Sequence, residues 1–211
     1  MKEYKMKCVI LGDSSVGKTS IIQHFLIGYF DERIDSTIGA SFVSKLFVNK
    51  EKNETVKFQV WDTAGQERYR AMIPMYVRDA QVALIVYDIT NYDSFLNLKT
   101  WLKFFEHDPD ICIVIISNKN DLVHLKDSRI KNQDALDFSK DNNAFFFDVS
   151  AKEGTNINKV FDFLLNKCKN LKQPKDKKII HLEDSFSNYD IIKYVIEESN
   201  EFVKNKCCLI S

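Results

Sequence analysis

One segment constrains the fold of this chain more than any other. The eight residues 12–19, Gly-Asp-Ser-Ser-Val-Gly-Lys-Thr, fit the pattern G-x-x-x-x-G-K-[ST]. An apolar, β-branched run precedes them at residues 6–11, and residues 19–26 follow with Ile22, Phe25 and Leu26 at helical spacing. A strand, a glycine-rich turn and a helix in this order predict a phosphate-binding loop. The alternative is a chance glycine-rich turn, which the preceding strand and the following helix disfavour.

The chemistry of such a loop follows from its backbone. Successive N–H groups point inward at phosphates, and the N-terminus of the following helix adds a favourable dipole. Lys18 places a positive charge near the β- and γ-phosphates, and Thr19 offers its hydroxyl to Mg²⁺. From this segment we expect nucleotide contacts by Ser14, Ser15, Val16, Gly17, Lys18, Thr19 and Ser20. The loop alone leaves the base and the reaction open.

Two further segments suit the γ-phosphate and a metal ion. Asp62 stands at the end of the predicted strand 55–61, where a carboxylate can hold Mg²⁺ through water. Gly65 lets a backbone N–H reach the γ-phosphate, and Gln66 can orient the attacking water. Thr37, in the loop before the strand 41–48, can complete the Mg²⁺ shell. We therefore predict Thr19, Thr37 and Asp62 as metal ligands and Gln66, Lys18 and Thr37 as catalytic residues.

The run Asn118-Lys119-Asn120-Asp121 directly follows the predicted strand 111–116 and selects the base. A carboxylate at Asp121 can accept both N–H groups on the Watson–Crick edge of guanine. Adenine lacks that donor pair and would leave the carboxylate buried and unpaired. Ser150, Ala151 and Lys152 follow the next predicted strand and could flank the same ring. These residues predict GTP and GDP as the ligands.

The composition suits one soluble domain with a tail. The chain has 211 residues, 45% of them hydrophobic, and its 30 Lys and Arg balance 30 Asp and Glu, which gives no support to nucleic-acid binding. From the charged N-terminus we expect no signal peptide, and no apolar run is long enough to predict a membrane span. Cys8, Cys112 and Cys168 are scattered, and we expect free buried thiols.

Strands alternate with helices along the first 172 residues. Residues 41–48 and 55–61 form a predicted hairpin, the apolar runs 82–88, 111–116 and 144–149 suit central parallel strands, and helices are expected at 94–105, 132–140 and 156–171. Gly28 is expected to end the first helix. The pattern predicts an α/β fold: a P-loop GTPase domain with a six-stranded, mostly parallel sheet, one antiparallel edge strand and flanking helices. We place this domain at residues 1–172 and a flexible tail at 173–211.

Residues 4–171 resemble a Ras-superfamily small GTPase of the Rab family. The resemblance rests on the segments 38–42 (IGASF), 57–61 (KFQVW), 67–70 (ERYR), 84–90 (LIVYDIT) and 94–98 (SFLNL) leading to Trp101. The segments 36–42 (STIGASF) and 71–76 (AMIPMY) resemble the early-endosomal Rab group.

This resemblance implies a GTP/GDP-dependent switch in vesicular traffic with slow intrinsic hydrolysis. It implies that Phe30 stacks on the guanine and that Phe42, Trp61 and Tyr76 form the surface that Rab effectors contact. The implied partners are effectors, an exchange factor, a GTPase-activating protein, a GDP-dissociation inhibitor and an escort protein. Three positions depart from common patterns: Asp79 where many Rabs have glycine, Ile34 where an aromatic residue is frequent, and Ser14 where Ras has glycine but the endosomal Rab group has serine.

The last residues predict a membrane anchor. Cys207 and Cys208 lie in the final five residues, resemble the doubly prenylated tails of Rabs, and also fit C-a-a-X from Cys208 with Ser as X. Two lipid chains give stable attachment where one is marginal. We expect the cytoplasmic face of intracellular membranes, endosomal by resemblance, with a cytosolic pool. The lipid, geranylgeranyl or farnesyl, stays open.

Two other functions compete with this one. A P-loop kinase acting on a small metabolite would need an acceptor pocket and usually lacks both Asn-Lys-x-Asp and Asp-Thr-Ala-Gly-Gln. A GTP-binding scaffold without useful hydrolysis is disfavoured by the intact Gln66 and Thr37, while Ile34 keeps it open.

Overall fold

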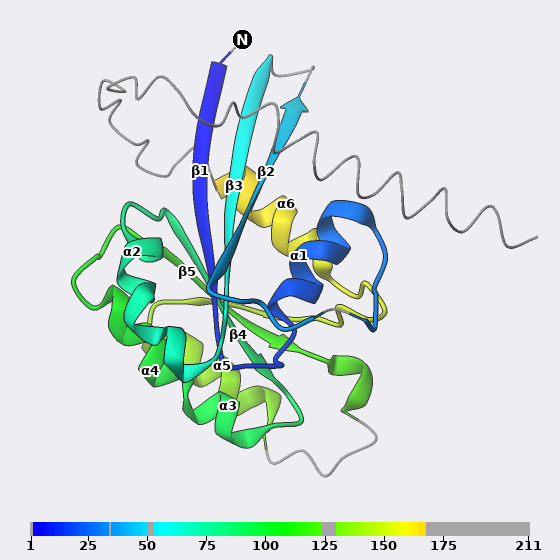
Figure 1. The fold of residues 1–211 in the computed structure, drawn as a ribbon, viewed down its shortest axis with the longest axis vertical. Coiled ribbons are helices and arrows are strands. Elements are labelled where there is room, and N and C mark those ends of the chain that lie inside the picture. Colours follow the sequence, from blue (N-terminus) through cyan, green and yellow to red (C-terminus); the bar gives the residue numbers. More distant parts are fainter. Residues whose placement is uncertain (1, 34, 50–52, 124–129, 168–211) are drawn as a thin grey trace, which may run out of the picture. The chain divides into compact units, whose positions relative to one another are not determined.

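A central sheet of six strands organises this computed structural model (Figure 1). The structure describes residues 2–33, 35–49, 53–123 and 130–167. All of them lie in the first of the two units into which the chain divides, Met1–Pro174. The second unit, Lys175–Ser211, holds the predicted anchor and lies outside the described residues, as does Ile34.

The sheet has the strand order β2-β3-β1-β4-β5-β6, and only β2 runs antiparallel to its neighbour. This confirms the predicted fold class, including the antiparallel edge strand. The strands are β1 (Lys2–Leu11), β2 (Ala40–Asn49), β3 (Glu54–Thr63), β4 (Val82–Asp88), β5 (Cys112–Asn118) and β6 (Phe145–Asp148). The hairpin β2–β3 pairs in register over its whole length, from Ala40 opposite Thr63 to Asn49 opposite Glu54.

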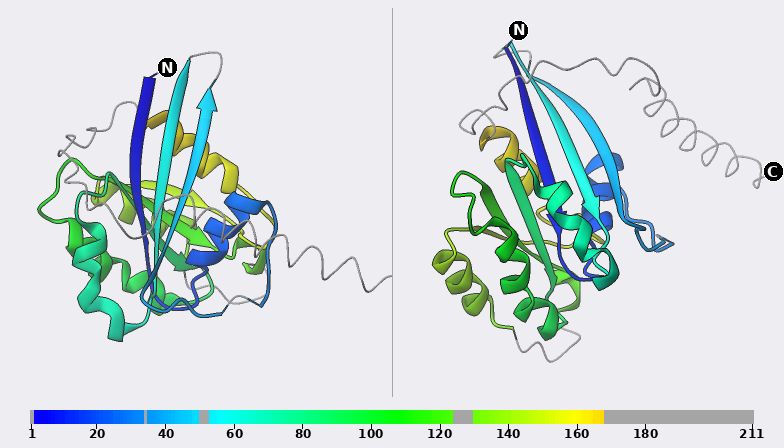
Figure 2. Two further views of the ribbon diagram at one scale, coloured as in Figure 1. Left: turned by 45° about the horizontal axis from the view of Figure 1, so that its top comes forward. Right: turned by 60° about the vertical axis from the view of Figure 1, so that its left-hand side comes forward.

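Strand β1 is longer than its apolar run predicts. It begins at Lys2 because its polar N-terminal half pairs with β3, from Lys2 beside Glu54 to Ile10 beside Asp62. Figures 1 and 2 show β1, β2 and β3 continuing together past the level of the other strands. A strand held by backbone pairing does not need the apolar pattern that reveals a buried one.

Helices cover both faces of the sheet (Figures 1 and 2). They are α1 (Lys18–Ile27), α2 (Ile73–Val77), α3 (Tyr92–Leu96), α4 (Leu98–Leu102), α5 (Asn132–Asp141) and α6 (Ile157–Lys167), with short 3₁₀ turns η1 (Glu67–Met72), η2 (Lys103–Phe105) and η3 (Asn120–Leu122). Helices α1 and α6 pack on one face, and α2, α3, α4 and α5 pack on the other. Gly28 ends α1 with φ 79°, and its N–H donates to the carbonyl of His24, as predicted.

The two faces explain the nearly continuous apolar runs. Alternate residues of a strand point to opposite faces. In β4, Leu84 packs with α1 and α6, whereas Ile85 packs with the helices of the other face. Both are fully buried. A strand covered on both faces therefore has apolar residues at successive positions and does not alternate between apolar and polar residues until its end.

The single helix expected at residues 94–105 is wrong. Asn91 caps its start by accepting from the N–H groups of Asp93 and Ser94, so α3 begins at Tyr92, before the predicted residue. The run then breaks at Asn97, which ends α3, and η2 closes it. Asparagine is a weak helix former because its amide competes for other partners. Here that amide donates to Asp13, far away in the sequence.

Two of the three scattered cysteines fall on described residues, and both are buried free thiols as predicted. Burial raises the pKa of the Cys8 thiol far above its usual range, with its neighbour Cys112 adding to the shift. Such a thiol stays protonated and packs as a small apolar group. Among the described residues, no helix is both long enough and apolar enough to span a membrane.

Candidate functional site

The predicted motifs meet around one pocket of about 460 Å³. Its walls come from the loop after β1, the loop after α1, and the segments that follow β3, β5 and β6. Apart from the loop after α1, which leads into the antiparallel strand β2, these walls lie at the carboxyl ends of strands, where open α/β sheets bind ligands. The predicted residues that line it are Ser14, Ser15, Gly17, Lys18, Thr19, Ser20, Phe30, Thr37, Gly65, Gln66, Asn118, Lys119, Asp121, Ala151 and Lys152.

Three predicted residues stand behind the pocket wall and support residues that line it. Val16 is buried and offers its carbonyl to Asn118. Asp62 accepts a hydrogen bond from the hydroxyl of Thr19, and the hydroxyl of Ser150 donates to Asp121. The pocket also has lining residues for which no ligand contact was predicted: Asp31, Glu32, Asp35, Ser36, Thr63, Ala64 and Leu122.

The phosphate end is built around Lys18. Its Nζ donates to the carbonyls of Gly12, at 2.9 Å, and Asp13, at 2.7 Å, so the ammonium is held across the loop. Burial lowers the pKa of Lys18 to about 8, and the charges of Asp62 and Asp13 only partly oppose this shift. The loop thus holds a desolvated cation that an anionic ligand would stabilise in its charged form.

Two glycines at the phosphate end are sterically required. Gly17 has φ 92°, and a Cβ there would collide with the amide nitrogen of Asn118. A Cβ on Gly65 would collide with the backbone carbonyls of Asp13 and Gly12. The segment after β3 can therefore lie directly on the phosphate loop only because residue 65 has no side chain.

The three predicted metal ligands lie together. The Thr19 hydroxyl donates to Oδ2 of Asp62 at 2.7 Å and lies 3.0 Å from the hydroxyl of Thr37. Oδ1 of Asp62 is buried and has no hydrogen-bond partner, and desolvation raises the pKa of this carboxyl despite the Thr19 hydrogen bond and the Lys18 charge. A small oxygen-preferring cation fits this set, since it would compensate the buried carboxylate. Mg²⁺ held by these side chains would neutralise phosphate charge.

At the base end, Asn118 joins the two halves of the pocket. It is 1% exposed. Its Nδ2 donates to the Val16 carbonyl at 2.9 Å, and its Oδ1 accepts from the N–H of Ala151 at 3.1 Å. The Ala151 carbonyl in turn accepts from Nδ1 of His24 on α1 at 2.9 Å. A carbonyl only accepts, so this His24 nitrogen carries the proton.

Ser150 orients the carboxylate that selects the base. Its hydroxyl donates to Oδ1 of Asp121 at 2.6 Å and itself accepts from the N–H of Glu153. Asp121 faces the pocket together with Phe30, as the prediction of a stacked and edge-recognised guanine requires. On the same rim, Lys152 lies 3.5 Å from Glu32, but both side chains are mostly exposed and the pair contributes little.

Asp88, at the end of β4, holds a residue of the pocket wall, and the motifs did not reveal it. Its Oδ2 pairs with Nζ of Lys119 at 2.8 Å, and its Oδ1 accepts from the backbone and the hydroxyl of Thr90. Burial would raise the pKa of Asp88, but the Lys119 and Thr90 hydrogen bonds outweigh it and hold the pKa below its usual range. A charged residue ending an otherwise apolar strand was the available signal.

Gln66 lines the pocket and is the N-cap residue directly before η1. Its side-chain oxygen accepts from Nε of Arg68 at 2.6 Å. The prediction that Gln66 orients a water therefore stays a prediction, and the structure shows which neighbour competes for its amide group.

The site has a phosphate-binding loop and, beside it, a cluster of hydroxyl and carboxylate groups. At the base end it has a second carboxylate. Together with the order of the six strands, these features define a P-loop small GTPase. The sequence model of the Ras family matches residues 7–170, and the chain belongs to that family. It is accordingly a GTP-hydrolysing switch that binds GTP, GDP and Mg²⁺ and works with the regulators of its family. A metabolite kinase is not supported.

The ion pair between Asp88 and Lys119 predicts a defect at the base end. We expect Asp88→Asn to speed GDP dissociation about tenfold, since the negative charge that pairs with Lys119 beside the pocket is lost and any remaining hydrogen bond is weaker. The release of a fluorescent GDP analogue from the purified protein measures this. The matched control is Asp137→Asn, whose 3.8 Å pair with Lys140 is exposed and should leave the rate unchanged. Equal rates in both variants would contradict the assigned role of Asp88.

The buried Lys18 predicts a pH dependence of affinity. Its pKa is about 8 in the ligand-free structure, and bound phosphates would raise it. The Kd for GDP should be flat below pH 8 and weaken by about tenfold per pH unit above it, because binding then requires uptake of a proton. The control is Lys18→Arg, because arginine stays protonated over this pH range. Any titration of the guanine base is unchanged in this variant, but the loss of affinity above pH 8 that comes from Lys18 should disappear. A flat profile in the parent protein would count against a depressed Lys18 pKa.

Proposed function

We propose that this Ras-family GTPase is a Rab-type switch that regulates vesicular membrane traffic on endosomal membranes. The observation that carries the proposal is a continuous aromatic cluster on the hairpin and the segment after it. The rings of Phe42 and Trp61 lie 5.0 Å apart, and Trp61 stacks on Tyr76 at 5.5 Å. These are the three residues that the Rab resemblance assigns to effector contact.

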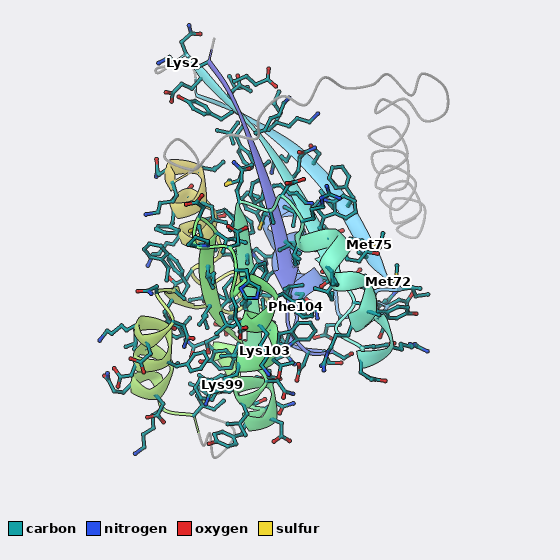
Figure 3. All side chains as sticks on the ribbon, turned by 90° about the vertical axis from the view of Figure 1, so that its left-hand side faces the viewer. Lys2, Met72, Met75, Lys99, Lys103 and Phe104 are labelled. Atoms are coloured by element: carbon teal, nitrogen blue, oxygen red, sulfur yellow. The ribbon has the colours of Figure 1, made fainter. Side chains whose placement is uncertain are left out.

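The arrangement supports a docking face rather than a filled core. All three rings are only half-buried, and Phe42 and Trp61 are direct cross-strand neighbours in the hairpin. Large apolar side chains in the segments next to these residues along the chain are exposed: Ile38 by 80%, Met75 by 69% and Met72 by 38%. Figure 3 shows Met72 and Met75 on the segment beside the one that carries Phe104. Exposed apolar groups gathered in this way are typical of protein-binding surfaces.

The face also adjoins the phosphate site. Thr37 and Gly65 line the pocket, and the N–H of Ala64 donates to the carbonyl of Gly39 at 2.8 Å. GTP would hold both segments through its γ-phosphate, and hydrolysis would release them. Rab-type effectors would then recognise only the GTP-bound face. The exchange factor, GDP-dissociation inhibitor and escort protein complete the proposed set of partners.

Membrane attachment through Cys207 and Cys208 belongs to the same proposal and rests on the sequence, because both residues lie outside the described part. The predicted departure at Asp79 falls on a described residue. Asp79 has φ 57°, a left-handed conformation that glycine adopts more easily, between α2 and β4. The turn is thus kept with an aspartate, at some cost in backbone strain.

The hydrolysis step is tested at Gln66. We expect Gln66→Leu to retain GTP binding while hydrolysis stimulated by a GTPase-activating domain falls by at least about 10²-fold, because water is no longer oriented. Single-turnover phosphate release measures this. Gln133→Leu, the same change on the exposed face of α5, is the control and should behave as the parent. Hydrolysis that is negligible in the parent, even with the activating domain, would instead favour the GTP-binding scaffold.

The membrane role is tested with the tagged full-length chain imaged against compartment markers. We expect an endosomal pattern for the parent and a cytosolic one for the double variant Cys207→Ser, Cys208→Ser, because both lipid attachment sites are gone.

Trp61→Ala should remain on membranes but lose partners captured by the GTP-bound parent. Membrane retention of the double cysteine variant would refute the anchor, and failure of the GDP-bound chain to bind a GDP-dissociation inhibitor would refute the Rab assignment.

A further inference from the structure

The carboxylate of Asp13 is turned away from the nucleotide pocket. Ser14 and Ser15 line that pocket and Asp13 does not. Its two oxygens are taken by side chains from the opposite side of the loop: Oδ2 accepts from Nδ2 of Asn97 at 2.7 Å, and Oδ1 accepts from Nε1 of Trp101 at 2.8 Å. A carboxylate in a phosphate loop would repel phosphates if it faced them, and these two donors fix it on the far side.

The same residue supports Lys18. The Asp13 carbonyl accepts from the Lys18 ammonium, so side chain and main chain of Asp13 are held at once by different partners. Trp101 is 1% exposed, and a buried indole N–H needs an acceptor. The break between α3 and α4 at Asn97 supplies the second donor. The phosphate loop is therefore fastened to these helices through one carboxylate.

The segment after β3 touches this junction from two directions. Gly65 lies against the Asp13 carbonyl, so closely that a Cβ would collide with it. The Arg70 guanidinium lies over the ring of Trp101, 5.2 Å from its centroid. The Nε of Arg70 is buried and has no hydrogen-bond partner, and the guanidinium meets the indole by a cation–π contact.

We propose that Asp13 and Trp101 are positioning residues of this GTPase. The hydrogen bond between them holds Asp13 in place, and with it the Asp13 carbonyl that accepts a hydrogen bond from the Lys18 ammonium. Arg70 lies on the indole of Trp101, so a movement of the segment that follows Gln66 changes how firmly Asp13 is held. The rate of nucleotide release then depends on α3 and α4, which contribute no residue to the pocket lining. The proposal rests on the GTPase class of the chain and not on its role in membrane traffic.

The test uses purified full-length protein and the release of a fluorescent GDP analogue in the presence of Mg²⁺. Trp101→Phe keeps an aromatic ring at the buried position but removes the N–H together with part of the ring system, and we expect release to be about tenfold faster. Asp13→Ala loses both hydrogen bonds and should be faster still. Because both changes remove the same bond, the double variant should match Asp13→Ala alone. Independent, multiplying effects, or no effect of Trp101→Phe, would overturn the proposal.

A control separates positioning from loosened packing. Phe105→Leu alters a buried ring on the same face, in η2, without touching the Asp13 carboxylate. It should lower the unfolding temperature and leave GDP release unchanged. If it speeds release as much as Trp101→Phe does, the effect is a general loss of stability and the proposal fails. Should Asp13→Ala not fold, Trp101→Phe and this control still decide the outcome.

The link to Arg70 has its own readout. The indole N–H signal of Trp101 in a ¹H–¹⁵N NMR spectrum, assigned by its loss in Trp101→Phe, reports the bond to Asp13 directly. We expect it to differ between the GDP form and a form with a non-hydrolysable GTP analogue, and to lose that difference in Arg70→Ala. Identical signals for both nucleotides in the parent protein would remove Arg70 from the mechanism.

Discussion

The site depends on one buried amide. Asn118 ends β5 with its side chain almost fully enclosed, and each end of that side chain has a single backbone partner: the Val16 carbonyl on the phosphate loop and the Ala151 N–H after β6. A buried amide with an unsatisfied end is costly, so these two bonds hold three separate segments at one spacing. Gly17 lies against the same amide and can carry no Cβ there. The distance from the phosphate end to the base end of the pocket is thus set by this residue.

Local chemistry made most of the fold predictable. Each central strand is covered on both faces and therefore has an apolar run with clear ends, and the hairpin has a polar turn between two strands. Where pairing replaces burial the pattern disappears, and so the first residues of β1 were missed. The helix at 94–105 was predicted as continuous because its apolar spacing is right. The break at Asn97 comes from a partner in the phosphate loop, which no window of local sequence contains.

The candidate site divides along the same line. Residues in short motifs, such as Lys18, Asp62 and Asp121, were predicted because spacing within a motif is local, and the structure brings them around one pocket or directly behind it. Two residues that support the motifs from outside them were not predicted. Asp88 pairs with a lysine on the next strand's end, and His24 reaches a carbonyl 127 positions away. These groups meet only because of the order of the strands in the sheet, and that order cannot be read from the local sequence.

Strand β3 explains how the state of the phosphate site can reach the aromatic cluster. Adjacent residues of a strand face opposite sides, so Trp61 joins the cluster while Asp62 turns inward to Thr19. The next residues continue the link, since the N–H of Ala64 donates to the carbonyl of Gly39, directly before β2, and Gly65 lies against Asp13. Any shift of this segment toward or away from the phosphates therefore moves the backbone between Trp61 and Gln66. Because Trp61 is the middle ring of the cluster, such a shift changes its contacts with both Phe42 and Tyr76. The end of β3 thus connects the phosphate site to the aromatic cluster on the surface.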